Sequence, residues 1–258
     1  MIEFKNVSFA YDEKLVLKEI SFKVNASESL VIMGPSGSGK STILRLILGL
    51  ECSQKGDIII EGRNICQMKE KQKREIRKKI GMVFQDGALF DSLSIWENVG
   101  YYLLEHTNMP VEEIGQKAIK MLGFVGLNAQ EVMDELPEQL SGGMQRRVAI
   151  GRALLSTNPK VMLYDEPTTG LDPQSAENVL GLIKKLHHER SIATIVVTHQ
   201  IADAIALANR FIVIVEGEIV FDGNLEELSR CYQPKVKEFL TPFRKSFIHV
   251  AQKKFIET

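Results

Sequence analysis

The fold of this chain is decided by the stretch Gly34-Pro35-Ser36-Gly37-Ser38-Gly39-Lys40-Ser41. It fits G-x-x-x-x-G-K-[ST] at every fixed position, and that pattern binds nucleotide phosphates. Its glycines let successive backbone N–H groups face one anion, while Lys40 reaches the β- and γ-phosphates and Ser41 presents its hydroxyl to Mg²⁺. The apolar run at residues 29–33 predicts a strand before the loop, and residues 42–48 predict a helix after it. The phosphates would then lie at a helix N-terminus.

The composition is that of an ordinary globular protein. The chain has 258 residues and a formal net charge of −1, which suits one large α/β domain and gives no general attraction to nucleic acid or anionic lipid. Its three cysteines, Cys52, Cys66 and Cys231, are widely separated, form no metal-spaced pair and suit a reducing compartment. We assign them no function. Neither a signal peptide nor an apolar run of roughly 20 residues is present in the sequence, so a cytoplasmic protein is expected.

Strands and helices alternate along most of the chain. Alternating residues predict half-buried strands at 2–7 and 17–24, and apolar runs predict buried strands at 56–62, 80–85, 161–166 and 193–199. Residues 210–221 predict a hairpin that turns at Glu216-Gly217. Helical periodicity runs from residue 86 to about 156, and a further helix is predicted at 178–186. The alternation predicts a parallel sheet covered on both faces, with an inserted helical subdomain.

Several of these predicted strands end in polar residues that suit nucleotide chemistry. Gln85 ends one strand at a point where ligands bind in parallel sheets. Asp165 would hold Mg²⁺ through water, and Glu166 is placed to orient or deprotonate the water that attacks the γ-phosphate. His199 ends the following strand and could hydrogen-bond the γ-phosphate. Tyr11 could stack on adenine, although an aromatic residue at a strand end can also simply pack on the sheet.

A second anion site is predicted where Ser141, Gly142 and Gly143 open an amphipathic helix. Two phosphate-binding surfaces are puzzling for a single nucleotide. The full set of motifs resembles the nucleotide-binding subunits of ATP-binding cassette (ABC) transporters. That set comprises the phosphate loop, Gln85, Leu-Ser-Gly-Gly at 140–143, Tyr-Asp-Glu-Pro at 164–167, Gly-Leu-Asp at 170–172 and His199.

The resemblance covers residues 1–230 and implies the ABC ATPase fold. This is an α/β P-loop NTPase fold with a RecA-like parallel core, an N-terminal antiparallel β subdomain and a helical subdomain, here at residues 86–156. Residues 231–258 would form a C-terminal extension. In this family two cassettes pack head to tail, and each ATP lies between the phosphate loop of one chain and the serine-glycine signature of the other.

The resemblance also implies a role for each motif residue. Tyr11 would stack on adenine, the loop from Gly34 to Ser41 and the adjoining Thr42 would hold phosphates, and Ser41, Gln85 and Asp165 would attend Mg²⁺. Glu166 would be the catalytic base, with Lys40 and His199 at the γ-phosphate. Ser141, Gly142 and Gly143 would complete the site of a second copy of the chain, and Asp172 would communicate across the interface. Met144 stands where the common signature has glutamine, and we expect catalysis to survive this change.

Residues 85–99, with 105–110, are similar to the ATPases of Mla-type lipid transport systems. In the family this region receives the coupling helix of the membrane permease. The resemblance implies ATP-driven movement of phospholipid, or another lipid, between the inner membrane and a mammalian-cell-entry-type lipid-binding protein. The subunit would lie at the cytoplasmic face of the inner membrane, bound through its permease, with no nucleic acid partner.

Two segments have an alternative interpretation. Phe243, Phe247 and Val250 predict a short amphipathic helix, which would pack on its own cassette or dock on the sibling ATPase or an accessory cytoplasmic subunit. The basic run at 69–79 is expected to be the solvated face of a short helix.

Other functions also fit part of the sequence. An ABC transporter of another small substrate, such as an amino acid, would share every catalytic residue. A soluble ABC ATPase acting on DNA or ribosomes usually has paired cassettes, long coiled coils or zinc sites, and a P-loop kinase would leave the signature without a purpose.

Overall fold

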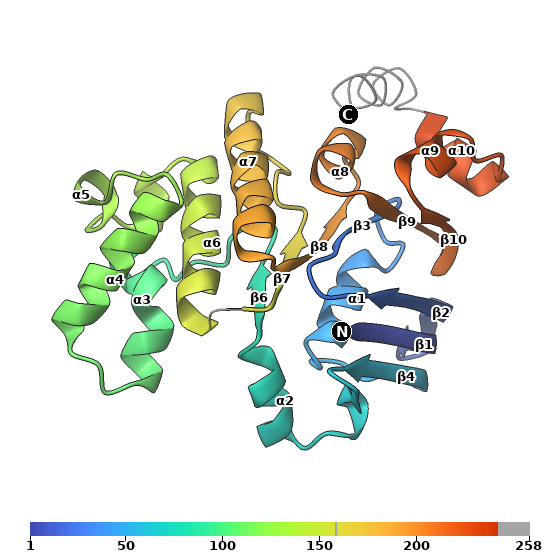
Figure 1. The fold of residues 1–258 in the computed structure, drawn as a ribbon, viewed down its shortest axis with the longest axis horizontal. Helices are drawn as coiled ribbons and strands as arrows, with labels where there is room; N and C mark the ends of the chain where they lie inside the picture. Colours follow the sequence, from blue (N-terminus) through green and yellow to red (C-terminus); the bar gives the residue numbers. More distant parts are fainter. Residues whose placement is uncertain (158, 242–258) are drawn as a thin grey trace. The chain divides into compact units, whose positions relative to one another are not determined.

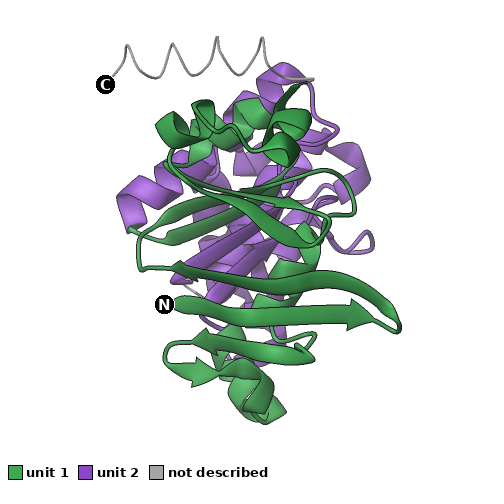
Figure 2. Cartoon of the chain, turned by 90° about the vertical axis from the view of Figure 1, so that its right-hand side faces the viewer, with its two compact units in different colours: residues 1–77, 191–258 green, residues 78–190 purple. Residues whose placement is uncertain are grey.

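The computed structural model describes residues 1–157 and 159–241, with strands and helices alternating along the chain (Figure 1). The chain divides into two compact units (Figure 2). Unit 1 comprises residues 1–77 and the chain from Ser191 onward, and unit 2 comprises residues 78–190. Both units combine strands with helices, so the α/β class expected from the sequence is confirmed.

Unit 1 contains an antiparallel sheet built largely from the N-terminal segment. Its strands are β1 (Ile2–Tyr11), β2 (Lys14–Val24), β4 (Lys55–Ile60) and β5 (Arg63–Asn64), in the order β2-β1-β4-β5. Phe4 and Phe22 are paired across β1 and β2, and their rings stack with centroids 4.6 Å apart. Because apolar residues alternate along β1 and β2, one face of this sheet can be buried.

A second set of strands in unit 1 is mainly parallel. β3 (Ser29–Met33) lies between β8 (Ala193–Thr198) and β9 (Arg210–Val215), and β10 (Glu218–Gly223) pairs antiparallel with β9. The predicted turn between β9 and β10 is confirmed, since Glu216 and Gly217 have φ values of 52° and 80°. Positive φ at both turn residues is typical of a two-residue hairpin loop. Every residue of β8 is buried, as expected for a strand inside such a sheet.

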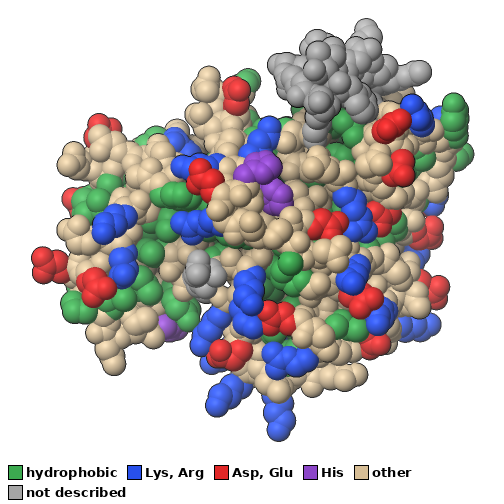
Figure 3. All heavy atoms as spheres, in the orientation of Figure 1, with side chains coloured by type: hydrophobic (Ala, Val, Ile, Leu, Met, Phe, Trp, Pro, Cys, Tyr) green, Lys and Arg blue, Asp and Glu red, His purple; other side chains and the backbone are tan. Residues whose placement is uncertain are grey.

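The helices of unit 1 are short. They are α1 (Lys40–Ile47), η1 (Ile65–Gln67), α2 (Glu70–Arg77), α8 (Ile201–Leu207), α9 (Leu225–Ser229) and α10 (Pro234–Leu240). In α2 only Ile76 is buried, and basic side chains gather at the foot of Figure 3, over α2. The basic run is therefore the solvated face of a helix, as predicted.

Unit 2 has a parallel pair of strands and most of the helices. The strands are β6 (Ile80–Val83) and β7 (Val161–Asp165). The helices are α3 (Ile95–His106), α4 (Val111–Phe124), α5 (Ala129–Val132), η2 (Pro137–Gln139), α6 (Gly142–Thr157) and α7 (Pro173–Arg190). Helices α3, α4 and α6 lie side by side (Figure 1), which matches the helical periodicity of this region.

Several predicted boundaries differ from the observed ones, among them the ends of β1 and β2 and the start of α7. The sequence places a helix at 178–186, whereas α7 begins at Pro173. Asp172 Oδ1 accepts the Ser175 N–H at 3.0 Å, so it caps the helix, and proline is favoured at the first helical position. The cap and the proline start α7 more than one turn before its first buried apolar residue, Val179.

The chain beyond residue 230 packs on unit 1 as far as it is described. Lys235 Nζ lies 2.7 Å from Glu216 Oε2, and Val236 is fully buried. The predicted helix with Phe243, Phe247 and Val250 lies outside the described residues. Within the described ranges, we find no helix with the length and apolarity needed to cross a membrane.

Candidate nucleotide-binding site

The phosphate loop joins β3 to α1 in unit 1 and holds its lysine inward. Lys40 Nζ donates to Gly34 O at 2.9 Å and to Pro35 O at 3.0 Å. The side chain is only 7% exposed. A cation is therefore held inside the curve of the loop, next to the start of α1, where the backbone dipoles also favour an anion.

Two positions of the loop require glycine. A Cβ on Gly34 would collide with the Ile214 carbonyl oxygen, and a Cβ on Gly39 would lie 2.6 Å from Leu17 Cδ2. Gly39 also has a φ of 100°, which side-chain-bearing residues rarely adopt. The backbone consequently approaches its neighbours closely at both ends of the loop.

The loop residues fit a phosphate chain. The Ser38 hydroxyl is buried and has no hydrogen-bond partner among the described residues, which is unusual for a buried polar group. Together with the Lys40 ammonium and the backbone N–H groups, it suits the oxygens of an anion. ATP would bring the phosphoanhydride bond to this loop, and the Ser41 hydroxyl at the start of α1 suits Mg²⁺.

Two further predicted residues lie in the same unit. Met33 pairs with Thr198, so Gly34 and His199 leave neighbouring parallel strands at the same edge, and His199 is exposed there. The half-buried Tyr11 accepts a hydrogen bond from Arg45 Nη1 at 3.2 Å. Because Arg45 lies on α1, Tyr11 is linked to the helix that begins with Lys40.

Unit 2 carries the second group of predicted residues. Val83 pairs with Tyr164, so Gln85, after β6, and Asp165, the last residue of β7, lie at the same edge of parallel strands, where ligands bind in such sheets. Gln85 is exposed and Asp165 is half-buried. Tyr164 itself is fully buried, and that burial raises the pKa of its phenol, so it packs as a neutral ring beneath this edge.

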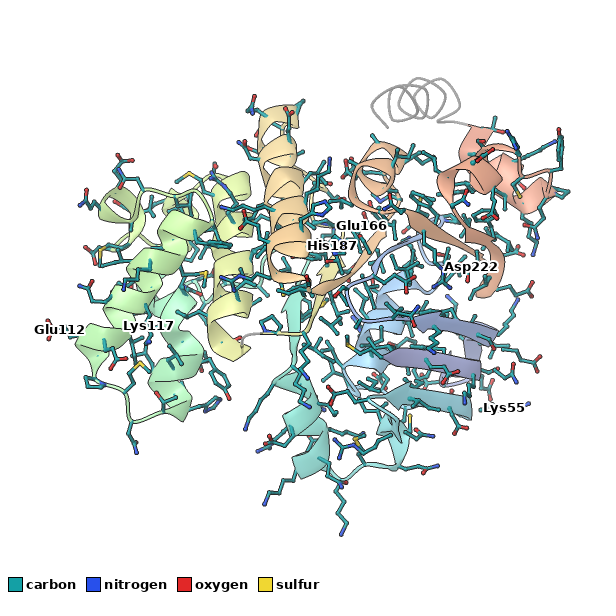
Figure 4. The ribbon with its side chains drawn as sticks, viewed as in Figure 1. Lys55, Glu112, Lys117, Glu166, His187 and Asp222 are labelled. Atoms are coloured by element: carbon teal, nitrogen blue, oxygen red, sulfur yellow. The ribbon has the colours of Figure 1, made fainter. Side chains whose placement is uncertain are left out.

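Glu166 lies just past the end of β7 (Figure 4). Its Oε2 accepts the Thr169 hydroxyl at 3.2 Å, and its carbonyl accepts the Thr169 N–H at 3.3 Å. The side chain is 9% exposed. A carboxylate held in this way can accept a proton from a water molecule placed against it, which is what a general base must do.

Asp172 ends the turn that follows Glu166. Hydrogen bonds from the Ser175 hydroxyl and backbone N–H lower the pKa of its carboxyl. The group is fully exposed at the start of α7, so it stays ionised and open to another molecule. Its predicted role in communication between chains stays a prediction.

The signature stretch opens α6. Ser141 Oγ accepts the Met144 N–H at 3.3 Å, so the serine caps the helix. Ser141 and Gly142 are exposed, whereas a Cβ on Gly143 would lie 2.6 Å from Ser175 Oγ. The signature thus packs against the start of α7 and presents its first two residues outward.

The residue after the unusual Met144 holds the signature in place. Gln145 Nε2 donates to Pro137 O at 2.7 Å and to Leu140 O at 3.1 Å. Met144 is half-buried, while Ser141 and Gly142 are exposed. The geometry agrees with the expectation that the anion-facing residues stay intact.

Sequence reasoning missed the contacts that hold the loop after Gln85. Arg152, on α6, donates to Gly87 O at 2.8 Å and Ala88 O at 2.7 Å, and Arg146 donates to Phe84 O. Helix α6, which begins with the signature, is therefore tied to this loop. Arg152, a charged residue inside the apolar stretch 148–155, is the signal that could have indicated it.

The end of the same loop is held by Asn98 of α3. Its Oδ1 accepts the Phe90 N–H at 2.8 Å, and its Nδ2 lies within 3.0 Å of Phe90 O and of Leu93 O and 3.1 Å from Ser94 O. The side chain is fully buried. Because all of these partners are backbone groups, no sequence pattern marked them.

The comparisons with known proteins give one family and relatives of two transport types. Residues 17–169 match the family described as ABC transporter. The intermembrane phospholipid transport system ATP-binding protein MlaF of Haemophilus influenzae is 35% identical over 93% of this chain and 90% of its own. The methionine import ATP-binding protein MetN 1 of Staphylococcus aureus is 38% identical over 88% of this chain and 67% of its own.

A solved structure extends the comparison to the bound state. An ATP-binding cassette, solved as a dimer in a post-hydrolysis state with ADP and Pi, has a TM-score of 0.78 and 35% identity to this chain. The match covers 87% of this chain and 98% of that cassette. A cassette related at this level has been captured as a dimer with the products of ATP hydrolysis.

Proposed function

Since the chain belongs to the ABC transporter family, we propose that its ATPase activity powers the transport of phospholipid, or another lipid, through a membrane permease. The coarser function follows from the family. The chain binds ATP with Mg²⁺ and hydrolyses it as the ATPase subunit of a transporter, and it works as a cassette dimer with permease subunits. The lipid substrate is the proposed step.

One observation carries the lipid assignment, which is the stretch from residue 85 to 110. It is similar to Mla-type ATPases in the region expected to meet the permease, and the MlaF relative is similar over nearly its full length. Phe90 of this region and the adjoining Phe84 are each 41% exposed. Exposed aromatic rings beside Gln85 suit a protein partner at this surface.

The loop contacts support a route from the permease to the nucleotide. Arg152 and Asn98 hold the two ends of the segment that follows Gln85. A permease that moves this segment would also move the backbone beside Gln85 and the helix that begins at the signature. Residues 86–105 are therefore expected to affect coupling more than hydrolysis itself.

The dimer would work as a clamp in this proposal. The phosphate loop of one chain and Ser141 of the other would hold one nucleotide, with Gln85 and Asp165 at Mg²⁺ and Glu166 at the attacking water. Charge-assisted hydrogen bonds contribute about 1.5–3 kcal/mol each. Closing the two chains on two nucleotides adds such bonds across the interface, and phosphate release removes them.

The finer partners belong to the same proposal. We place the subunit at the cytoplasmic face of the inner membrane, bound to its permease, with a mammalian-cell-entry-type lipid-binding protein and an accessory cytoplasmic subunit in the complex. We also propose residues 1–230 as the nucleotide-binding domain, with its helical subdomain at 86–156, and 231–258 as an extension that reaches a partner.

Import of an amino acid is the second candidate. The methionine import relative has 38% identity, and an importer would use the same predicted catalytic residues. Only the 85–110 stretch distinguishes the two candidates.

The test is to purify this chain from detergent-solubilised native membranes and to identify proteins and lipids together by mass spectrometry. A polytopic permease, a mammalian-cell-entry-type protein and bound phospholipid are expected. A permease with a solute-binding protein would reject lipid transport and leave the ATPase assignment intact. A Phe90→Asp variant is purified in the same way. It should lose the permease if this surface is the contact.

A further inference from the structure

Two of the three cysteines lie together in unit 1. Cys52 follows the C-terminal end of α1, and Cys66 lies in η1. The hydroxyl of Ser53, the residue next to Cys52, is 3.8 Å from Cys66 Sγ. Cys52 also lies close enough to the Cys66 thiol to add to the rise in its pKa, of which burial is the larger cause. Residues separated in sequence thus form a dithiol pair, which sequence spacing did not predict.

Local packing keeps the two segments together. A Cβ on Gly49 would lie 2.8 Å from Ile65 Cδ1, so the end of α1 packs on η1. Asn64 Oδ1 accepts the Cys66 N–H at 3.0 Å, and Ser53 Oγ lies 3.2 Å from Gly56 O. Both cysteines are half-buried. The pair is therefore preorganised and still within reach of a small reagent.

A lysine makes the two thiols chemically different. Lys73 Nζ, on α2, donates to Cys52 Sγ at 3.5 Å, so an ammonium lies beside a sulfur that would carry negative charge during thiol–disulfide exchange. Burial raises the pKa of the Cys66 thiol, and the interaction with Cys52 adds to that effect. This is the arrangement of an attacking thiol beside a resolving thiol.

We propose that Cys52 and Cys66 are a redox modification site that closes to a disulfide by exchange with a small-molecule disulfide of the glutathione class. In the first step the Cys52 thiolate attacks one sulfur of that disulfide. The small S–S bond breaks, and one small thiolate leaves and takes up a proton. Cys52 is then in a mixed disulfide.

The second step closes the pair. Cys66 loses its proton, its sulfur attacks the Cys52 sulfur, and the second small thiol leaves. The two cysteines are oxidised by two electrons in total, and one small disulfide is reduced to two thiols. Added dithiol reverses both steps.

The disulfide would join the end of α1 to η1. Helix α1 begins with Lys40 and Ser41, so the modification acts on the helix that carries the phosphate loop. Closing residues 52 to 66 into a loop restricts the unfolded chain, so the oxidised protein should melt at a higher temperature. The inference does not depend on which substrate is transported.

The test uses the full chain in mixtures of oxidised and reduced glutathione, followed by acid quenching, alkylation and peptide mass spectrometry. We expect a peptide pair linked through Cys52 and Cys66, with Cys231 left as a thiol or a separate adduct. The Tm should rise on oxidation and return on reduction. Separate glutathione adducts on Cys52 and Cys66, with no linked pair at any ratio, would overturn the proposal.

Single substitutions separate the two steps. Cys66→Ser should stop the reaction at a glutathione adduct on Cys52, because the resolving thiol is missing. Lys73→Met should slow adduct formation at Cys52 by about tenfold near neutral pH, and Lys73→Arg should restore the rate. Adduct formation at Cys231 is the internal control. Equal rates at Cys52 and Cys231 in the parent chain would reject Cys52 as the attacking thiol.

Discussion

At the scale of single residues, Glu166 combines an unusual backbone with its predicted role as base. Its φ is 47°, a left-handed conformation that costs a non-glycine residue about 1–3 kcal/mol and persists only where the surroundings impose it. The strand end before it and the Thr169 turn after it impose it here. Such outliers gather at functional sites, which supports the role inferred from the motif.

Replacing Glu166 by glutamine should separate hydrolysis from binding. The amide side chain would keep the shape and the contact with Thr169 but could not accept a proton, so phosphate release by the assembled dimer should fall by about 10²–10⁴-fold. Nucleotide affinity should change little. Glu177→Gln, an exposed carboxylate on α7, is the control. Hydrolysis at the parent rate in Glu166→Gln would show that another group is the base.

Lys40 is predicted to act on binding first. Its ammonium is held by two loop carbonyls and is preorganised for phosphate oxygens. A charge-assisted hydrogen bond contributes about 1.5–3 kcal/mol, so Lys40→Met should raise the Kd for ATP by about 10- to 100-fold in a titration. Lys69→Met, at the exposed residue just before α2, should leave the Kd unchanged. Equal affinities in all three proteins would contradict the placement of the phosphates.

At the scale of elements, the loop after Gln85 depends on one buried amide. Asn98→Asp keeps an acceptor for the Phe90 N–H but replaces the donor to Phe90 O, Leu93 O and Ser94 O by an anion. Burying an unpaired polar group and a charge should lower the free energy of unfolding by about 3 kcal/mol. Urea unfolding measures this loss. Asn108→Asp, exposed after α3, is the control, and an equal effect there would reject the argument.

A salt-bridge cluster ties β9 to the turn before β3. Arg210 Nη1 lies 2.8 Å from Glu28 Oε1, and Arg210 Nη2 lies 2.7 Å from Asp222 Oδ2 (Figure 4 labels Asp222). Burial alone would raise the pKa of Glu28, but hydrogen bonds from Asn25 and Arg210 outweigh it and lower that pKa below 4.5. The ionised carboxylate is thus stabilised in the folded state.

The sign of this shift predicts how stability depends on pH. The contribution of Glu28 is fully present above pH 4.5, its ordinary pKa, and is lost as pH falls through the lower folded value. Glu28→Gln should therefore cost about 1 kcal/mol at pH 7, discounted for solvent screening, and nothing in strong acid. Denaturation curves across this range measure it, with the exposed Glu13→Gln as control. A constant difference at all pH values would contradict the linkage.

How far the sequence predicts these elements depends on where their contacts come from. Apolar runs predicted β3, β7 and β8, because burial of consecutive residues needs no knowledge of the partners. The start of α7 was not predicted, because Asp172 caps the helix before its periodic apolar residues begin. Asn98, Arg152 and the Cys52–Cys66 pair were missed because each contacts residues far along the chain, which leaves no local pattern.

At the scale of the whole molecule, the predicted site residues fall into two groups. The phosphate loop, Tyr11 and His199 belong to unit 1, while Gln85, Asp165, Glu166 and the signature belong to unit 2. Within each unit, pairing of parallel strands explains the grouping, because polar residues follow strands that end at one edge. The sequence order of motifs and strands was enough to predict that much.

The signature's purpose depends on a second copy of the chain. Ser141 and Gly142 are exposed at the start of α6. A second anion site has no evident use in a chain that binds one nucleotide at its phosphate loop. Head-to-tail packing would bring the exposed Ser36 of one phosphate loop close to Ser141 of the other chain. The relative solved as a dimer with ADP and Pi shows that such cassettes do pair.

A cross-linking experiment tests this packing directly. In a chain with Cys52, Cys66 and Cys231 changed to serine, one preparation carries Ser36→Cys and another carries Ser141→Cys. A disulfide forms only when the two Cα atoms come within about 7 Å, so mild oxidation of the mixture should give a covalent dimer on gels when ATP and Mg²⁺ are added. Each preparation alone should stay monomeric, because head-to-tail packing brings neither site next to its own copy. Cross-linking in one preparation alone, with no additional covalent dimer in the mixture, would show that the two chains pack with like surfaces together.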